Sequence, residues 1–344
     1  MERARDLLAC PGCAGALAAD WSCPGCGARF DAADGIPNLR LPGNDATEVV
    51  RRFYGQAPFP AYRPHETLQR LRARADQSVF ARLLDQAIPS DARIVDVGCG
   101  TGQMCLYLAR ADRVVVGADL TRASLLLGAA AARRFAIDGV QFVETDLHRP
   151  GLRNGAFDLV YSSGVLHHTP DPSASFVQLV RLARPGGIIV VGVYNAFARL
   201  PLRLRRFIAR LSGFRLVLFD PVLRDRDDEP ARREAWLRDQ YQHPEEHCHT
   251  LGEVQHWFAT NGVEYLRSYP SAVLGEEPGA LFERATDNWR PEGWLAQLGW
   301  MRTLGREGGL FYTVGRRRTL GTGSHGLEAR VNAQLISRAA QPRE

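Results

Sequence analysis

Residues 93–102, RIVDVGCGTG, decide the fold of this chain. The first five form a short run rich in β-branched residues, which is typical of a buried parallel strand. Gly98, Gly100 and Gly102 follow at alternate positions, where glycine lets the backbone turn tightly and approach a ligand. A helix that begins near Gly102 would point its free backbone N–H groups at that ligand. The loop alone leaves the ligand open, because many nucleotide-binding proteins carry one and an ordinary strand–helix turn can use glycines for packing.

Four more strand-like runs follow the loop, and helical stretches separate them. This alternation predicts a parallel sheet with helices on both faces. Asp119 directly follows the first run, about 20 residues after the loop, where a doubly wound fold places a carboxylate for ribose hydroxyls. The runs cover residues 114–118, 140–144, 157–162 and 188–194.

The motifs VDVGCGTG, GADL, ETDL, FDLVYSSGVLHHTPDP and LARPGG occur in this order between residues 93 and 194. As a set they resemble the class I S-adenosylmethionine (SAM)-dependent methyltransferases, in the branch that acts on small molecules. The resemblance implies an α/β fold with a doubly wound, seven-stranded Rossmann-like sheet. Dinucleotide dehydrogenases are the alternative, but their G-x-G-x-x-G fingerprint needs the third glycine one position later.

The resemblance also implies the residues that contact the cofactor. The glycine loop would hold the methionine part, Asp119 the ribose, and Ser163 would lie where the methyl group is presented. Leu120, Asp146 and Leu147 would border the adenine. A proline- and aromatic-rich lid before the sheet adds Tyr62, which either binds the methionine carboxylate or packs the lid. The expected cofactor-binding residues are Tyr62, Asp96, Gly98, Gly100, Thr101, Gly102, Gln103, Asp119, Leu120, Asp146, Leu147 and Ser163.

The composition is that of a globular protein, with 45% hydrophobic and 24% charged residues and a formal charge of +5. No 18-residue apolar run or secretion signal occurs, so we expect a cytoplasmic protein without stable membrane insertion. All 43 basic residues are arginine. The absence of lysine excludes Schiff-base chemistry, a P-loop lysine and the lysine-based tetrads of ribose methylation.

Two Cys-Pro-Gly-Cys pairs lie near the N-terminus, at Cys10 and Cys13 and at Cys23 and Cys26. This spacing predicts a closed four-sulfur zinc site, which is structural and not catalytic. Two disulfides are the less expected alternative in a cytosolic chain. The segment resembles the zinc ribbons that partner tRNA and protein methyltransferases or are fused to rRNA methyltransferases. It would either recognise substrate or stabilise the catalytic domain.

The sequence divides into six segments. A ribbon and linker (1–45) precede a helical lid (46–92), with helices expected at residues 47–56 and 67–88. The SAM-binding core (93–195), a cap with a histidine-rich loop (196–260), the last strands with an insertion (261–318) and a tail (319–344) follow. Strands are expected at residues 263–269 and 310–315. The insertion between them carries Trp289, Trp294 and Trp300, and we expect it to cover the acceptor pocket or form a homodimer contact.

The histidine-rich loop contains His243, Glu246 and His249, just before Thr250 and Glu253 form a capping box. Three interpretations stay open: a general base for the acceptor, a second metal site, or a hydrogen-bonded structural loop. His167 and its neighbour His168 would line the methyl-transfer site or serve the fold. The expected catalytic residues are His243, Glu246, His249 and His167.

Residues 195–213 interleave arginines with large apolar residues. This basic amphipathic pattern suits a membrane surface, an anionic substrate, or the solvated face of a cap helix, which we favour.

These features predict a SAM-dependent methyltransferase that acts on a small-molecule acceptor by in-line displacement, with a histidine as base. An RNA base methyltransferase, with the ribbon recognising tRNA or rRNA, is the alternative. A non-catalytic cofactor-binding partner protein is a third hypothesis. Enzymes that methylate exocyclic amines of nucleic acids usually carry an Asp/Asn-Pro-Pro-aromatic tetrad after the fourth strand, whereas this chain has residues 162–165, SSGV.

Overall fold

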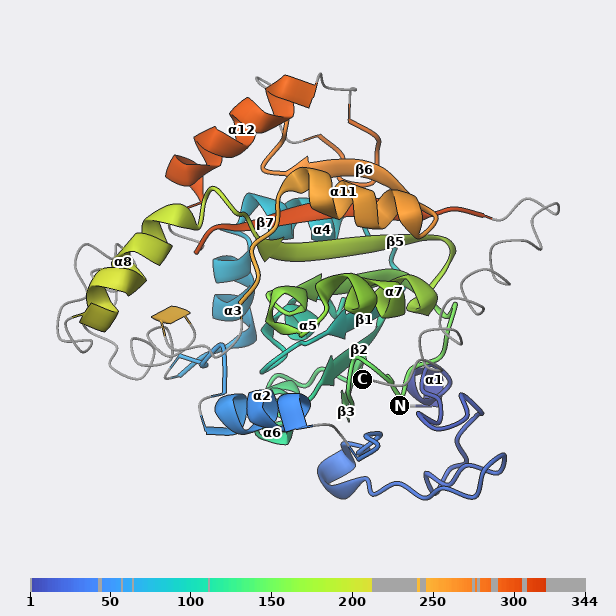
Figure 1. Cartoon of the computed structure of the whole chain (residues 1–344). Coiled ribbons are helices and arrows are strands. Elements are labelled where there is room, and N and C mark those ends of the chain that lie inside the picture. Colours follow the sequence, from blue (N-terminus) through green and yellow to red (C-terminus); the bar gives the residue numbers. More distant parts are fainter. Residues whose placement is uncertain are drawn as a thin grey trace, which may run out of the picture.

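The computed structural model describes residues 2–42, 45–56, 58–63, 65–110, 112–211, 240–241, 246–273, 276, 279–285, 290–304 and 308–319 (Figure 1). His243, Trp289 and the tail from residue 320 lie outside the described residues. Within them, no helix is both long and apolar enough to span a bilayer.

Seven strands form one sheet in the order β3-β2-β1-β4-β5-β7-β6. All expected strands are present, and β7 is antiparallel to both of its neighbours, whereas the pairs among β1 to β5 are parallel. The doubly wound, seven-stranded prediction is confirmed. The strands are β1 (Arg93–Val97), β2 (Val114–Asp119), β3 (Val140–Glu144), β4 (Phe157–Ser163), β5 (Ala183–Tyr194), β6 (Val263–Tyr269) and β7 (Leu310–Arg317).

Helices cover both faces of the sheet, which is why apolar residues dominate the central strands. On one face, Phe176 and Phe258 pack over the strands from α7 (Pro172–Leu182) and α11 (Leu251–Thr260). On the other face, the strands meet α4 (Val79–Ala87), α5 (Gln103–Leu108) and α6 (Arg122–Arg134). The remaining helices are α1 (Glu2–Arg5), α2 (Asp45–Gln56), α3 (Leu68–Ala75), α8 (Leu200–Leu211) and α12 (Arg290–Thr303).

Two expected boundaries were wrong. The single helix predicted for residues 67–88 is divided into α3 and α4, because the Ser78 side chain caps a new helix by accepting from Ala81 N at 3.3 Å. Strand β5 begins at Ala183 and not at Ile188. Ala183 already pairs with Phe157, and the register then shifts so that Ile188 pairs with Leu159. The residues between them form an irregularity in the strand that a sequence pattern does not reveal.

The N-terminal ribbon lies against the β3 edge of the sheet (Figure 1). Leu39 N donates to Glu144 O at 2.8 Å, and Glu144 N donates to Pro37 O at 3.0 Å. The ribbon therefore extends the sheet by a short parallel bridge between Asn38 and Glu144. In the insertion, Trp300 is buried against Phe311, with ring centroids 5.5 Å apart.

Candidate active site

A cavity of about 590 Å³ opens at the carboxyl ends of β1, β2, β4 and β5. Ligand pockets commonly measure roughly 300–1,000 Å³, and this edge of a doubly wound sheet is where they form. Nine of the twelve residues expected to bind the cofactor line the cavity. These nine are Asp96, Gly98, Gly100, Gln103, Asp119, Leu120, Asp146, Leu147 and Ser163.

The glycine loop after β1 is packed too tightly for side chains. A Cβ on Gly100 would lie 2.2 Å from Phe59 O, and one on Gly98 would lie 2.1 Å from Val165 Cγ2. Both residues also have positive φ, +54° and +76°, which favours glycine. The loop backbone thus forms the cavity wall, pressed between the lid and the segment after β4.

Tyr62, Thr101 and Gly102 are the three expected cofactor residues that do not line the cavity. Tyr62 Oη donates to Thr101 O at 2.8 Å, and Thr101 Oγ1 donates to Pro60 O at 2.6 Å. Gly102 adopts the left-handed conformation just before α5 and faces the Phe142 ring. Tyr62 and Thr101 therefore connect lid segment 58–63 to the glycine loop through hydrogen bonds. This arrangement agrees with the alternative in which Tyr62 packs the lid.

Asp96 and Asp119 are two of the carboxylate residues that line the cavity, and they lie next to the glycine loop. Asp119 accepts from Gly100 N and Thr121 N, both at 2.8 Å, and burial raises the pKa of Asp119. Asp96 accepts from Cys105 Sγ at 3.4 Å, and burial raises its pKa to about 7. Asp119 is fixed by two backbone donors, while its side chain still faces the cavity.

On its β5 side, away from β2 in the sheet, the cavity is lined by Ser163, His168, Tyr194, Gln240 and Tyr312. Gln240 Nε2 donates to Tyr194 Oη at 2.7 Å. Sequence reasoning missed Gln240 and Tyr194. The position of Tyr194 at the carboxyl end of β5 could have identified it, because ligands bind at these strand ends.

A fully buried arginine, Arg199, packs against the ring of Tyr194 in this part of the cavity wall. The guanidinium carbon of Arg199 lies 3.6 Å from the centre of the Tyr194 ring. Arg199 Nη1 donates to Gln240 Oε1 and to Gly308 O, the latter at 2.6 Å. Sequence reasoning also missed this role of Arg199, because it predicted a solvated helix face around that position.

Glu246 is the counter-charge of this arginine. Its carboxylate lies 2.6 Å from the nearest guanidinium nitrogens of both Arg199 and Arg206. Burial opposes its ionisation, but the hydrogen bonds and charges of the two arginines prevail and lower its pKa to about 2. Glu246 does not line the cavity, and a carboxylate held ionised in this way is a weak base.

The described histidines take different positions. His249 lies outside the cavity wall, with Nδ1 3.7 Å from Glu253 and its ring edge-on to Trp257; burial lowers its pKa. His167 is fully buried, and its ring centre lies 3.9 Å from that of Tyr194. Its neighbour His168 lines the cavity, whereas His167 does not. The predicted capping box at Thr250 and Glu253 is confirmed.

The four ribbon cysteines converge, with their Sγ atoms all within 4.8 Å of one another. Cys10 Sγ lies 3.6 Å from Cys26 Sγ, and Cys13 Sγ lies 3.4 Å from Cys23 Sγ. Tetrahedral zinc with Zn–S bonds of about 2.3 Å would separate the sulfurs by about 3.8 Å. The donor set therefore fits Zn²⁺. Among the described residues, no second group of three or more potential ligands converges.

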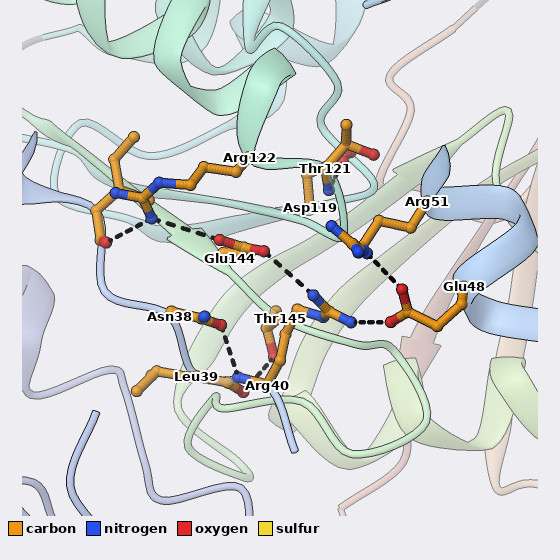
Figure 2. Close-up of polar contacts among 11 residues, drawn as sticks. Asn38, Leu39, Arg40, Glu48, Arg51, Asp119, Thr121, Arg122, Glu144 and Thr145 are labelled. Carbon is orange, nitrogen blue, oxygen red and sulfur yellow. Dashed lines mark hydrogen bonds and ion pairs between the residues drawn. The ribbon is translucent and has the colours of Figure 1, made fainter. Parts of the chain in front are cut away.

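Charged side chains join the ribbon to the lid and the core (Figure 2). Glu144, at the end of β3, pairs with Arg122 of α6 at 3.4 Å and with Arg40 at 3.3 Å. Arg40 also pairs with Glu48 of α2. No residue from 2 to 42 lines the cavity, so these contacts serve attachment of the ribbon.

Residues 95–191 match the family model described as a methyltransferase domain. An uncharacterized protein of Synechococcus sp. is 28% identical over 198 residues, which are 51% of this chain and 48% of that protein. A trans-aconitate 2-methyltransferase of Deinococcus radiodurans is 34% identical over 147 residues, 40% of this chain and 54% of that protein. The chain spans about half the length of the curated relatives it matches.

Among solved structures, a magnesium protoporphyrin IX methyltransferase from Synechocystis with bound SAM aligns with a TM-score of 0.45 and 15% identity. The alignment covers 80% of this chain and 99% of that one. The matched domain, the sheet order and the motifs agree. Residues 95–191 therefore form a methyltransferase domain on a seven-stranded sheet, and a four-cysteine cluster precedes that domain.

Proposed function

We propose that this chain transfers a methyl group from SAM to a small-molecule acceptor inside the cavity. One observation carries the proposal: the same cavity is lined by the glycine loop and Asp119, at the ends of β1 and β2, and by His168 and Tyr194, after β4 and at the end of β5. A cavity of this size can hold two reactants in line.

The cofactor end has the chemistry that SAM requires. The Asp119 carboxylate would accept hydrogen bonds from the ribose hydroxyls, since backbone donors already fix its orientation. The bare backbone at Gly98 and Gly100 would allow the methionine part to lie close to the loop. Leu120 and Leu147 would flank the adenine. When bound, SAM supplies a methyl group on a positively charged sulfur that a nucleophile can attack.

At the acceptor end, His168 and Tyr194 would contact the nucleophile. Histidine can take up a proton near neutral pH, so His168 is our proposed base. Tyr194 would orient the acceptor, because Gln240 fixes its oxygen and Arg199 supports its ring. Glu246 would act only by positioning Arg199. The predicted base His243 lies outside the described residues and stays a prediction.

For the ribbon, we propose a structural zinc ion and a stabilising role. The converging cysteines and the contacts with β3 support this role, and the absence of residues 2–42 from the cavity wall weakens the substrate-recognition hypothesis.

The test is untargeted mass spectrometry of extracts incubated with the purified protein and SAM carrying a deuterated methyl group. We expect label in a small metabolite. His168→Ala and Tyr194→Phe should lower the labelling rate by about 10²-fold or more and about tenfold, respectively. His256→Ala is the matched control, because His256 is exposed on α11. Label confined to nuclease-digested RNA, or rates that neither variant changes, would contradict the proposal.

A further inference from the structure

Helix α8 presents a stripe of large apolar side chains to solvent. Leu204, Phe207 and Leu211 are 62%, 61% and 74% exposed, and Leu200 and Ile208 are also exposed. Their spacing of three and four residues places them on one face of the helix. A helix on a protein surface normally turns its apolar stripe inward and its polar side outward. Here the inward face is narrow: Leu202 and Ala209 pack with Tyr241.

The charged residues within α8 itself have one sign. Residues 200–211 contain four arginines and no acidic residue. Arg206 is held by Glu246, whereas Arg203 and Arg210 are exposed next to the apolar stripe. Exposed leucine and phenylalanine flanked by arginine are typical of helices that lie in the interface of an anionic membrane.

Helix α12 adds a second set of exposed apolar side chains. Trp294, Leu295 and Leu298 are all about half exposed. Figure 1 shows α8 and α12 at the same end of the molecule. The segment that leads into α8 contacts α12 directly, because the Phe197 and Trp294 rings lie 5.3 Å apart and Asn195 Nδ2 donates to Gln297 Oε1 at 3.0 Å.

A short segment of chain connects this surface to the acceptor end of the cavity. Tyr194, which lines the cavity, immediately precedes the segment that leads into α8. Arg199, in the same segment, donates a hydrogen bond to Gln240, which also lines the cavity.

We propose that the exposed faces of α8 and α12 dock the protein on an anionic lipid bilayer. The arginines complement lipid phosphates, and the leucine, phenylalanine and tryptophan side chains suit the boundary between headgroups and acyl chains. A second copy of this chain fits less well. In a two-fold dimer through α8, the Arg203 and Arg210 side chains of both copies would face one another. Docking requires no methyl transfer, so a failure of the docking proposal would leave the proposed function unaffected, and the reverse also holds.

The test is co-sedimentation of the full chain with vesicles of equal parts phosphatidylcholine and phosphatidylglycerol. We expect binding that weakens as salt rises and is much weaker on pure phosphatidylcholine. Phe207→Ser with Leu211→Ser should lower the partition constant about tenfold or more, because both side chains lose contact with lipid. Arg203→Glu with Arg210→Glu should abolish the preference for anionic vesicles. Circular dichroism should show that these surface variants keep the native fold.

The matched control is Leu127→Ser with Arg133→Glu on α6, which also replaces an exposed leucine and an exposed arginine. We expect it to bind vesicles as the wild type does. Wild-type protein that stays in the supernatant, or an α6 variant that loses as much binding as the α8 variants, would overturn the proposal. A wild-type dimer that Phe207→Ser dissolves, without any vesicle binding, would assign the surface to a second copy instead.

Discussion

At the scale of single residues, the least expected feature is the buried pair of Arg199 and Glu246. Removing one partner of a buried ion pair costs roughly 3–5 kcal/mol, because the other charge remains in the interior. The carboxylate has a pKa of about 2, compared with an ordinary value of 4.5. Such a lowered pKa stabilises the fold above pH 4.5, and this stabilisation is lost as the pH falls through 2.

We therefore predict that Glu246→Gln lowers the free energy of unfolding by about 3 kcal/mol at pH 7. The difference from wild type should shrink as the pH falls from 4.5 towards 2, because the wild-type carboxyl becomes neutral as well. Urea unfolding at several pH values measures this difference. Glu283→Gln, at an exposed position, should change stability by less than about 0.5 kcal/mol. Equal effects of both variants would mean that the ion pair is unimportant.

At the scale of elements, the ribbon is attached to the sheet by backbone as well as by charge. Its residues 37–39 run beside β3, and Glu144 holds Arg40 and Arg122 (Figure 2). A short ribbon buries too little apolar surface to fold without a metal or disulfides. Metal binding would therefore also support the β3 edge.

We predict that the purified full chain contains about one zinc ion. Cys13→Ser should lose the zinc and lower the melting temperature, because the proposed site needs all four cysteines. Cys248→Ser is the control, since Cys248 lies outside the cluster. Elemental analysis and thermal unfolding test this prediction. A zinc-free chain of unchanged stability, or equal zinc loss in both variants, would refute the structural metal.

At the scale of the whole molecule, the sequence predicts best what depends on neighbouring residues. The glycine loop, the strand runs and the capping box at Thr250 each lie within about a dozen residues, and all were found in the structure. The cysteine pairs likewise converge as their spacing predicts. Such local patterns reflect backbone conformation and burial, which the nearby side chains largely determine.

The acceptor end could not be predicted in the same way. It combines Tyr194 at the end of β5, Arg199 before α8, and Gln240, which is separated from Tyr194 by 46 positions. Nothing in a basic amphipathic pattern shows that Arg199 turns inward while Arg203 faces solvent. The partners of Glu246 could not be predicted for a related reason: they are two arginines, one from α8 and one from the segment before it.

The most direct test of the central claim, a SAM site formed by the glycine loop and Asp119, is calorimetric titration of the purified chain with SAM. We predict one site in the wild type. Asp119→Asn should bind about ten- to a hundredfold more weakly, because a charge-assisted hydrogen bond to the ribose contributes roughly 1.5–3 kcal/mol. Asp91→Asn, at an exposed position before β1, should bind as the wild type does. Absence of binding to the wild type, or equal affinity of the Asp119 variant, would contradict the account.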